Sequence, residues 1–389
     1  MPKYKFSEIA YNINQKKMPE PGDEEMYIGL EHLDSGSLKV KRWGSDVPIT
    51  GEKLVMKKGD ILFGRRNTYL RRAAIAPHDG IFSAHGMIFR PNTAVMDEDY
   101  FPFFISSDYF MNAAIRISVG SLSPTVNWKT LKELEFDIPD LESQRKSAEL
   151  LTAANRLKEA YEILLEETDQ LVKSQFIEMF GDPIDNPNGW TKITVNEAIK
   201  RGFIARPLDG NHGEKHPKGD DYVPDGVPFI MAQDLKEKQV DFSTCHFITE
   251  KQAKTLKKGW AKTGDVLLTH KGTIGRIAIV QPSQYENLLL TPQITYYRCL
   301  KEIDNEYLAA FFGTYFFINQ LNQMVTGTTR ASVTITQQEN LELIIPSKDM
   351  QKAFVKFVKQ SDKSKFEIKQ SIKNITEVIN SLLQQDFNI

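Results

Sequence analysis

The feature that most constrains this chain is a long internal duplication. One pair of matching segments is GDILF at residues 59–63 and GDVLL at 264–268. A longer pair is GSLSPTVNWKTLKELEFDIP at 120–139 and GTTRASVTITQQENLELIIP at 327–346. In each copy a glutamine lies five residues past the last proline (Gln144 and Gln351), and a phenylalanine ends the copy (Phe180 and Phe387). The repeat is far longer than a solenoid unit, so the sequence predicts two copies of one large, two-part unit.

The second part of each copy has the pattern of a long helix. From Asp140 to Phe180 there is neither glycine nor proline, and apolar residues recur at alternating intervals of three and four, which is typical of a coiled-coil seam. The second copy, from Ser347 onward, repeats the pattern but places Ser361 and Lys365 on the seam. We expect long helices over 140–181 and 347–389 that pack on each other. The alternative is two amphipathic helices that each cover a separate core.

The remaining parts, residues 1–139 and 182–346, have the pattern of α+β domains with small curved sheets. Short β-rich runs such as MYIGL and VPFIMA are separated by Gly, Pro and Asn turns. Each part also contains one aromatic-rich stretch with helical spacing, at residues 100–117 and 306–325. We expect the aromatic side chains of these stretches to lie in the core.

Composition bears on where such a chain works. No apolar run approaches the roughly 20 residues that span a bilayer. The first residues, MPKYKFSEIAYNINQKK, lack the apolar core of a signal peptide. The chain has 2 cysteines among 389 residues, which favours a reducing compartment and no disulfide framework. We therefore expect a cytoplasmic protein with no membrane partner.

Charge is segregated although the net charge is only −2. Residues 53–72 hold seven basic residues against Asp60, and residues 251–276 hold seven against Asp265, so both runs carry +6. Residues 140–180 hold nine acidic and five basic residues. One basic run is ordinarily a solvated surface. Two such runs at the same point of a repeat favour a single polyanion contacted twice, and duplex DNA is the natural candidate.

The residue types in these runs suit recognition as well as binding. Arginine pairs with guanine and asparagine with adenine, whereas lysine, hydroxyl groups and backbone amides bind phosphate. The two Gly-Ser/Thr loops of the repeat are also rich in donors. Because the two runs differ in sequence, the two halves should read different half-sites. The candidate DNA-contact residues are Arg65, Arg66, Asn67, Tyr69, Arg71, Arg72, Thr269, His270, Lys271, Thr273, Arg276, Ser121, Ser123, Thr328, Thr329 and Arg330.

Motifs for catalysis are missing. Neither a GxxxxGK[ST] loop nor a GxGxxG fingerprint occurs. The HGEKH segment at 212–216 differs from HExxH in the position of its glutamate, and Gly213 and Pro217 argue against a helix there. Cys245, His246 and His270 lack metal-ligand spacing. The sequence therefore predicts no catalytic residue, no metal and no cofactor in this chain.

These segments together resemble a known family. GDILFGRRNTYLRR with FSAHGMIFRP, GDVLLTHKGTIGRIAIV with LTPQITYYRC, and the ending FDIP…Q…FIEMFGDP resemble the specificity subunits of type I restriction–modification systems. The resemblance covers essentially the whole chain. It implies target recognition domain 1 at 1–139, spacer helix 1 at 140–181, target recognition domain 2 at 182–346 and spacer helix 2 at 347–389.

The resemblance also implies a mechanism and partners. Each recognition domain would read one half of a bipartite, asymmetric site in double-stranded DNA. The two helices would form an antiparallel coiled coil that sets the spacing and docks two methyltransferase subunits. Those subunits would bind S-adenosylmethionine and methylate adenine, and a motor–nuclease restriction subunit would join for cleavage. This chain would be a non-catalytic subunit.

Two other interpretations remain open at this point. The chain could be a two-headed coiled-coil scaffold that binds protein, although the matched basic runs argue against it. It could also be the specificity part of a split restriction–methylation enzyme. A steep loss of affinity with salt would distinguish DNA binding from protein binding.

Overall fold

The computed structural model describes residues 1–213, 216–326 and 331–387 and divides into two compact units. Unit 1 comprises Met1–Leu164 with Ile368–Ile389, and unit 2 comprises Leu165–Glu367. Each unit therefore combines one globular part with the beginning of one long helix and the end of the other. The division into residues 1–139, 140–181, 182–346 and 347–389 stays a prediction, because the compact units divide both helices in the middle.

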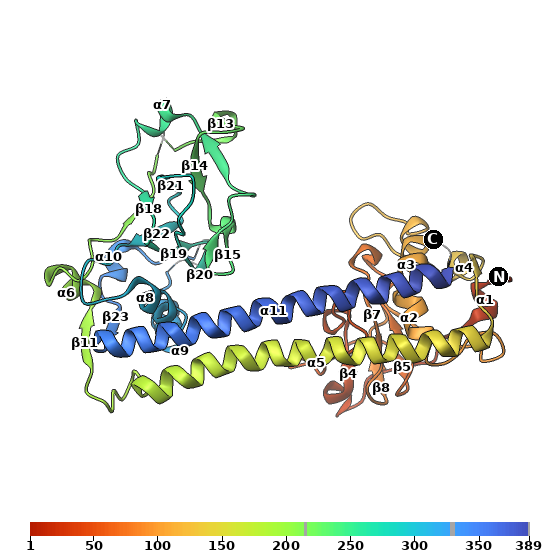
Figure 1. Ribbon diagram of the computed structural model, residues 1–389. Helices are drawn as coiled ribbons and strands as arrows, with labels where there is room; N and C mark the ends of the chain where they lie inside the picture. Colours follow the sequence, from red (N-terminus) through yellow and green to blue (C-terminus); the bar gives the residue numbers. More distant parts are fainter. Residues whose placement is uncertain (214–215, 327–330, 388–389) are drawn as a thin grey trace. The chain divides into compact units, whose positions relative to one another are not determined.

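Two helices of 40 residues dominate the secondary structure: α5 (Leu141–Phe180) and α11 (Lys348–Phe387) (Figure 1). Asp140 caps the start of α5, where its carboxylate accepts a hydrogen bond from the Ser143 amide (2.9 Å). The helix ends at Gly181, whose φ of 76° is readily adopted only by glycine. The two predicted long helices are confirmed. No helix in the described part of the chain is long and apolar enough to cross a membrane.

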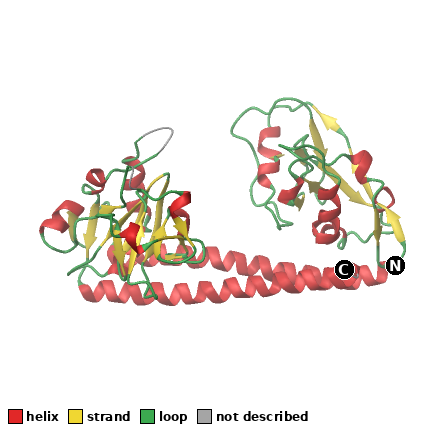
Figure 2. Ribbon diagram, turned by 90° about the horizontal axis from the view of Figure 1, so that it is seen from above, coloured by secondary structure: helices red, strands yellow, loops and turns green. Residues whose placement is uncertain are grey.

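Unit 1 is built on two four-stranded sheets with short helices around them (Figure 2). The first is antiparallel with strand order β2-β9-β6-β7, and the second has the order β3-β5-β8-β4 with a parallel β4–β8 pair. Strands β1 and β10 pair separately. The elements are β1 (Lys3–Lys5), α1 (Phe6–Ile9), β2 (Ala10–Ile13), β3 (Lys16–Lys17), β4 (Tyr27–Ile28), β5 (Lys53–Met56), β6 (Ile61–Phe63), β7 (Ala73–Ile75), β8 (Gly80–Phe82), β9 (Met87–Pro91), α2 (Phe101–Ser106), α3 (Asp108–Arg116), α4 (Trp128–Leu131) and β10 (Glu135–Asp137).

Unit 2 repeats the antiparallel sheet of unit 1 but has a different second sheet and an additional two-stranded sheet, β15-β16. Its antiparallel sheet has the order β12-β22-β19-β20, its second sheet has the order β13-β17-β14-β21-β18 with a parallel β14–β21 pair, and β11 pairs with β23. The elements are β11 (Thr191–Thr194), α6 (Val195–Lys200), β12 (Leu208–Asp209), β13 (Tyr222–Val223), β14 (Val227–Ile230), β15 (Leu235–Lys236), β16 (Gln239–Val240), β17 (His246–Ile248), α7 (Glu250–Ala253), β18 (Trp260–Lys262), β19 (Val266–Lys271), β20 (Thr273–Ile279), β21 (Asn287–Leu290), β22 (Ile294–Tyr297), α8 (Asn305–Phe312), α9 (Tyr315–Gln323), α10 (Ile335–Gln338) and β23 (Glu342–Ile345). The duplication seen in the sequence thus extends to the strand order of the antiparallel sheet, whereas the second sheets differ in strand number and order.

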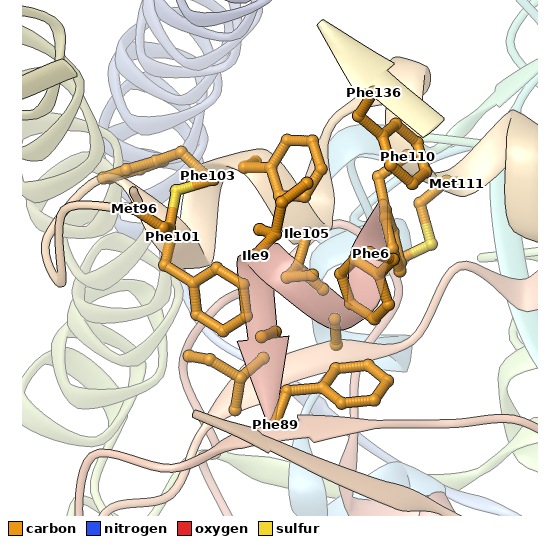
Figure 3. Packing of buried hydrophobic residues seen from close by; sticks show 14 of the residues in the cluster. Phe6, Ile9, Phe89, Met96, Phe101, Phe103, Ile105, Phe110, Met111 and Phe136 are labelled. Atoms are coloured by element: carbon orange, nitrogen blue, oxygen red, sulfur yellow. The ribbon is translucent and has the colours of Figure 1, made fainter. Parts of the chain in front are cut away.

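The aromatic-rich stretches form helix pairs rather than single helices. In unit 1 the break falls at Ser107, whose hydroxyl caps α3 by accepting from the Phe110 amide (3.2 Å). In unit 2 Thr314 caps α9 in the same way. The aromatic side chains do form the core, as Figure 3 shows for Phe6, Phe89 and Phe110 of unit 1.

The repeated Gly-Asp pair has the same structural role in both units. Gly59 and Gly264 have φ values of 90° and 88°, which let the chain turn sharply before β6 and β19. The buried Asp60 carboxylate accepts two hydrogen bonds from Arg90 (2.5 and 3.0 Å). Asp265 accepts two from Arg298 (2.8 and 2.7 Å), and this hydrogen bonding raises the pKa of Arg298. In each copy the aspartate of the Gly-Asp pair therefore connects the start of the central strand, β6 or β19, with an arginine in or directly after the neighbouring strand, β9 or β22.

The repeated glutamine joins each long helix to its own globular part. The Gln144 side chain donates to the carbonyls of Val95 (2.9 Å) and Pro139 (2.8 Å) and accepts from the Asp97 amide (2.8 Å). Gln351 makes the same three bonds with Glu302, Pro346 and Asp304. Both glutamines are fully buried. Losing either side chain would leave buried backbone groups without partners.

Within each unit the two long helices pack in opposite directions. In unit 1 the start of α5 and the end of α11 share one hydrophobic core through Leu151 and Leu383. In unit 2 the end of α5 and the start of α11 share another, where the rings of Phe180 and Phe354 lie 5.4 Å apart. This confirms an antiparallel pairing in which Ser361 is a buried polar residue of the seam.

Candidate nucleic-acid interface

In unit 1 the arginine-rich end of the first basic run, residues 65–72, forms a tight loop between β6 and β7. A short 3₁₀ helix, Thr68–Leu70, lies in the loop, and Asn67 and Arg71 on either side of it have φ values of 53° and 50°. Such left-handed conformations are uncommon for residues with a side chain, and they cluster at functional loops. Arg66 and Tyr69 are exposed, and 56% of the Tyr69 side chain surface is accessible. These two side chains form the outer face of the loop.

The four arginines of this loop have different surroundings. The Arg66 guanidinium is exposed and donates to the Ser123 hydroxyl (3.3 Å). The Arg71 guanidinium instead bonds Asp108 and Asn112 of α3. Arg65 and Arg72 are half-buried, and Arg65 has a buried Nε with no hydrogen-bond partner among the described residues. Arg66 is therefore the arginine most accessible to a ligand.

The Gly-Ser loop lies directly beside this basic loop. The Asn67 amide donates to the Pro124 carbonyl (2.8 Å), and the Val126 amide donates to the Arg65 carbonyl (2.9 Å). Ser121 is exposed and Ser123 is half-buried. The structure thus brings together two segments that the sequence analysis selected separately. Leu122 of the Gly-Ser loop is 94% exposed. It was not among the predicted contact residues, although a leucine stands out in a loop of glycine and serine.

The equivalent place in unit 2 is a β-hairpin instead of a long loop. Gly272, with φ of 77°, is the turn between β19 and β20. Lys271 is half-buried next to the tip, while Thr273 and Arg276 are exposed. One Arg276 nitrogen donates to the Ala232 carbonyl (3.1 Å). The two units therefore present different shapes as well as different residues at the same position of the sheet.

The second Gly-Thr loop returns to this hairpin as its counterpart does in unit 1. The Gly272 amide donates to the Ala331 carbonyl and the Val333 amide to the His270 carbonyl, both at 2.9 Å. Three predicted contact residues of this loop, Thr328, Thr329 and Arg330, lie outside the described residues.

Two predicted contact residues of unit 2 are buried. The Thr269 hydroxyl accepts from the Arg276 amide (2.9 Å), and the His270 Nδ1 lies 2.8 Å from the Val333 carbonyl. Burial lowers the pKa of His270, which favours the neutral imidazole with a proton on Nδ1. A register shift between Leu268 and His270 interrupts the strand alternation that would expose one of these two residues. Thr269 and His270 therefore support the hairpin from inside.

A polar cluster beside the second basic run involves Asp209 at the end of β12. Its carboxylate accepts from Lys258 and from His212, both at 2.6 Å. Burial raises the pKa of Asp209, but these two hydrogen bonds outweigh it and the net shift is downward. His212, the first histidine of the HGEKH segment, is thus a hydrogen-bond partner of Asp209. Among the residues that the structure describes, no group of three or more His, Cys, Asp or Glu side chains could hold a metal ion.

The cysteines do not resemble catalytic nucleophiles. Burial raises the pKa of Cys245 to about 11 and that of Cys299 to about 12. Both side chains are therefore thiols at neutral pH, whereas a reactive cysteine has a lowered pKa.

Comparison with known proteins identifies the family. The family model for the type I restriction modification DNA specificity domain matches residues 6–167 and 208–377. The chain is 20% identical over 367 residues to the type I restriction enzyme MjaVIII specificity subunit of Methanocaldococcus jannaschii, covering 90% of this chain and 83% of that one. It is 23% identical over 286 residues to the EcoBI specificity subunit of Escherichia coli, covering 66% of this chain and 57% of that one.

Solved structures show the same fold. One is a chain from a structure described as the basis of complex assembly and conformational transition of the type I R-M system, with a TM-score of 0.59, 16% identity and coverage of 99% of this chain and 97% of that chain. Another is the type I restriction–modification S subunit from M. genitalium, with a TM-score of 0.54, 13% identity and coverage of 99% and 96%. The family model covers most of the chain in two segments, one for each copy of the repeat. The chain belongs to the type I restriction–modification specificity subunit family.

Proposed function

We propose that this chain is the DNA-reading subunit of a type I restriction–modification complex. The loop beside β6 reads one half of a bipartite site, and the hairpin of β19 and β20 reads the other half. One observation carries this proposal. The β6–β7 loop of unit 1 and the β19–β20 hairpin of unit 2 occupy the same position of their antiparallel sheets, and both expose polar side chains: Arg66 and Tyr69 in unit 1, Thr273 and Arg276 in unit 2. Arginine, threonine and stacked aromatic rings are suited to base edges and phosphates.

The long helices supply a spacer and a protein-docking surface. Leu150, Leu157, Leu164 and Leu171 recur every seven residues on α5 and are 58%, 50%, 44% and 53% exposed. The three-and-four spacing of the sequence predicted that these leucines belong to the coiled-coil seam, and this was wrong, because the buried seam instead contains Leu151 and Phe176. A second heptad row on a helix is suited to another helix, and methyltransferase subunits are the partners that this family membership suggests.

The chemistry of the complex is assigned to these partners. In this proposal two methyltransferase subunits bind S-adenosylmethionine and methylate adenine, and a motor–nuclease subunit joins for restriction. The present chain selects the site and is non-catalytic. The high thiol pKa values of Cys245 and Cys299 agree with this assignment.

The modular part of the proposal is tested by mapping methylated adenines in cells that carry the complex. Arg66→Ala should relax the sequence requirement in one half-site only, and Arg276→Ala should relax it in the other half-site only. Losing a good bidentate base contact would reduce discrimination by about 1–3 kcal/mol. Lys129→Ala, which removes an exposed lysine side chain on α4, is the control. Relaxation of both half-sites by each single variant would contradict the modular reading.

DNA binding itself is tested by a salt titration of the complex on a duplex that contains the mapped site. The logarithm of the affinity should fall linearly with the logarithm of the salt concentration, by about 0.9 for each phosphate contact. An affinity that does not respond to salt would favour the protein-binding scaffold instead.

A further inference from the structure

We infer that a row of lysines on α11 binds the phosphate backbone of DNA outside the half-site that unit 2 reads. This inference rests on the proposed function and adds a contact to it. The row consists of Lys352, Lys356, Lys359 and Lys363, which are all exposed. Spacings of four, three and four residues place them on one face of the helix, over a length of about 16 Å.

The lysine row borders an open groove rather than a flat surface. The groove has a volume of about 600 Å³ and lies between α11 and the beginning of α8, with Asp304 and Glu306 on its other side. Glu306 pairs with Lys359 (2.9 Å). Lys352, Lys356 and Lys363 make no ion pair within the described part of the chain. Three ammonium groups are therefore available for an external anion.

The face that carries these lysines is not required for the packing of α11. The α5-facing seam contains Phe354 and Ser361, and the globular part is held by Gln351 and by the ion pair of Asp362 with Lys238 (3.0 Å). Four exposed like charges within three turns repel one another, which opposes folding slightly. Such an arrangement is stabilised when an anion binds.

Two kinds of polyanion could bind here, an acidic protein surface or DNA, and the composition of the row favours DNA. Protein interfaces are depleted in lysine and need buried apolar or aromatic anchors. Between Lys352 and Lys363 no large apolar side chain is exposed, because Phe354 and Val355 are buried and Phe357 and Val358 are half-buried. Lysine binds phosphate as a point charge without sequence preference. The apolar row on α5 has the opposite character, so the two helices present different surfaces to different partners.

The first copy of the repeat lacks this row. The equivalent positions on α5, counted from Gln144 and Gln351, are occupied by Arg145, Glu149, Thr152 and Arg156. Arg145 lies near Asp97 of its own unit (3.5 Å). The inferred contact therefore belongs to unit 2 alone, and it should bind the DNA backbone beside one half-site but not beside the other.

The test uses the assembled complex and a triple variant, Lys352→Gln, Lys356→Gln and Lys363→Gln. The salt dependence of DNA binding should weaken by about 0.9 in slope for each lost phosphate contact. The methylated sequence should stay unchanged. Ethylation of spacer phosphates beside the unit 2 half-site should interfere with binding by the unmodified complex and should not interfere with binding by the variant.

The matched control removes the same charge elsewhere in unit 2, with Lys173→Gln, Lys200→Gln and Lys301→Gln, and should keep the original slope. An unchanged slope in the lysine-row variant, together with weaker recovery of the methyltransferase subunits, would overturn the inference and assign the row to a protein. If the unmodified complex binds DNA without salt dependence, the proposed function fails first, and the contact inferred here fails with it.

Discussion

At the scale of single residues, the Gly-Asp pair shows a structural reason for a motif that both copies of the repeat contain. Asp265 is 1% exposed and accepts two hydrogen bonds from Arg298 as well as one from the Lys262 amide (2.9 Å). Asp265→Asn would leave the Arg298 guanidinium without its counter-charge. Breaking a buried pair costs about 3–5 kcal/mol, and we expect the lower end because Arg298 is partly exposed.

Urea denaturation followed by the tryptophans of unit 2 measures this cost. The control is Glu250→Gln, which breaks an exposed pair with Lys254 and should change the free energy of unfolding by at most about 0.5 kcal/mol. Equal effects of the two variants would show that the Asp265–Arg298 pair does not support the fold.

His270 should make the stability of unit 2 depend on pH. Burial lowers its pKa, and the Lys271 and His212 charges act in the same direction, while the Val333 carbonyl and Asp209 oppose it. The unfolded histidine has a pKa of about 6.5, so below this pH the unfolded chain takes up a proton that the folded chain resists. The contribution of neutral His270 to the stability of unit 2 is therefore fully present above about pH 6.5, and it is lost as the pH falls toward the lower pKa of the folded state.

Urea unfolding between pH 7.5 and pH 5 checks this sign. His270→Gln should reduce the loss of stability on the acid side, because the amide does not titrate. His85→Gln, which changes an exposed histidine of unit 1, should leave the pH dependence of unit 2 unaltered. A His270→Gln protein with the original pH dependence would assign the effect to another group.

At the scale of elements, the sequence predicted the two long helices, but it did not show which side chains of the β6–β7 loop and the β19–β20 hairpin are buried. A helix of 40 residues carries its own signal, since the apolar spacing, the Asp140 cap and the Gly181 stop are all local. The loops depend on contacts that are distant in sequence. Arg71 looks like a free cation until α3 places Asp108 beside it. Regular strand alternation would expose one of the two neighbours Thr269 and His270, but the register shift in β19 lets both be buried.

The apolar row on α5 leads to a prediction at this scale. Leu150→Gln with Leu157→Gln should change the free energy of unfolding by no more than about 1 kcal/mol in total, because surface substitutions usually stay within about 0.5 kcal/mol each. The same variant should bind the methyltransferase subunits much more weakly, since two of the four leucines of the row are lost. Affinity purification of the co-expressed complex measures this binding.

Val378→Gln is the matched control for that experiment. Val378 is a 53% exposed apolar residue on α11, where leucines do not recur at seven-residue spacing. Normal recovery of the methyltransferase subunits with the double leucine variant would show that α5 docks no partner through this row.

At the scale of the whole molecule, the duplication supports the proposal that one chain reads an asymmetric DNA site. The two units share the strand order of the antiparallel sheet, the Gly-Asp pair and the buried glutamine, and each takes the beginning of one long helix and the end of the other. What they do not share is the reading edge, which is a loop with a 3₁₀ helix in one unit and a hairpin in the other. A common core with different exposed loops is what we expect of a subunit whose two halves read different DNA sequences.

The proposed spacing role of the helices leads to a prediction at this scale. Both helices pass between the units at Leu164–Leu165 and Glu367–Ile368. Insertion of three heptads at each point keeps the antiparallel seam in register and adds about 30 Å to both helices. Three heptads are preferable to one because of the helical repeat of DNA. About 30 Å corresponds to about 9 base pairs, which is close to the 10–10.5 base pairs of one DNA turn. Both half-sites therefore still face nearly the same side of the duplex. Mapping of methylated adenines should then give the original half-sites with a spacer longer by about 9 or 10 base pairs. Insertion into α5 alone should instead misalign the seam and reduce assembly. An unchanged spacer after the matched insertion would mean that the helices do not set the distance between the half-sites.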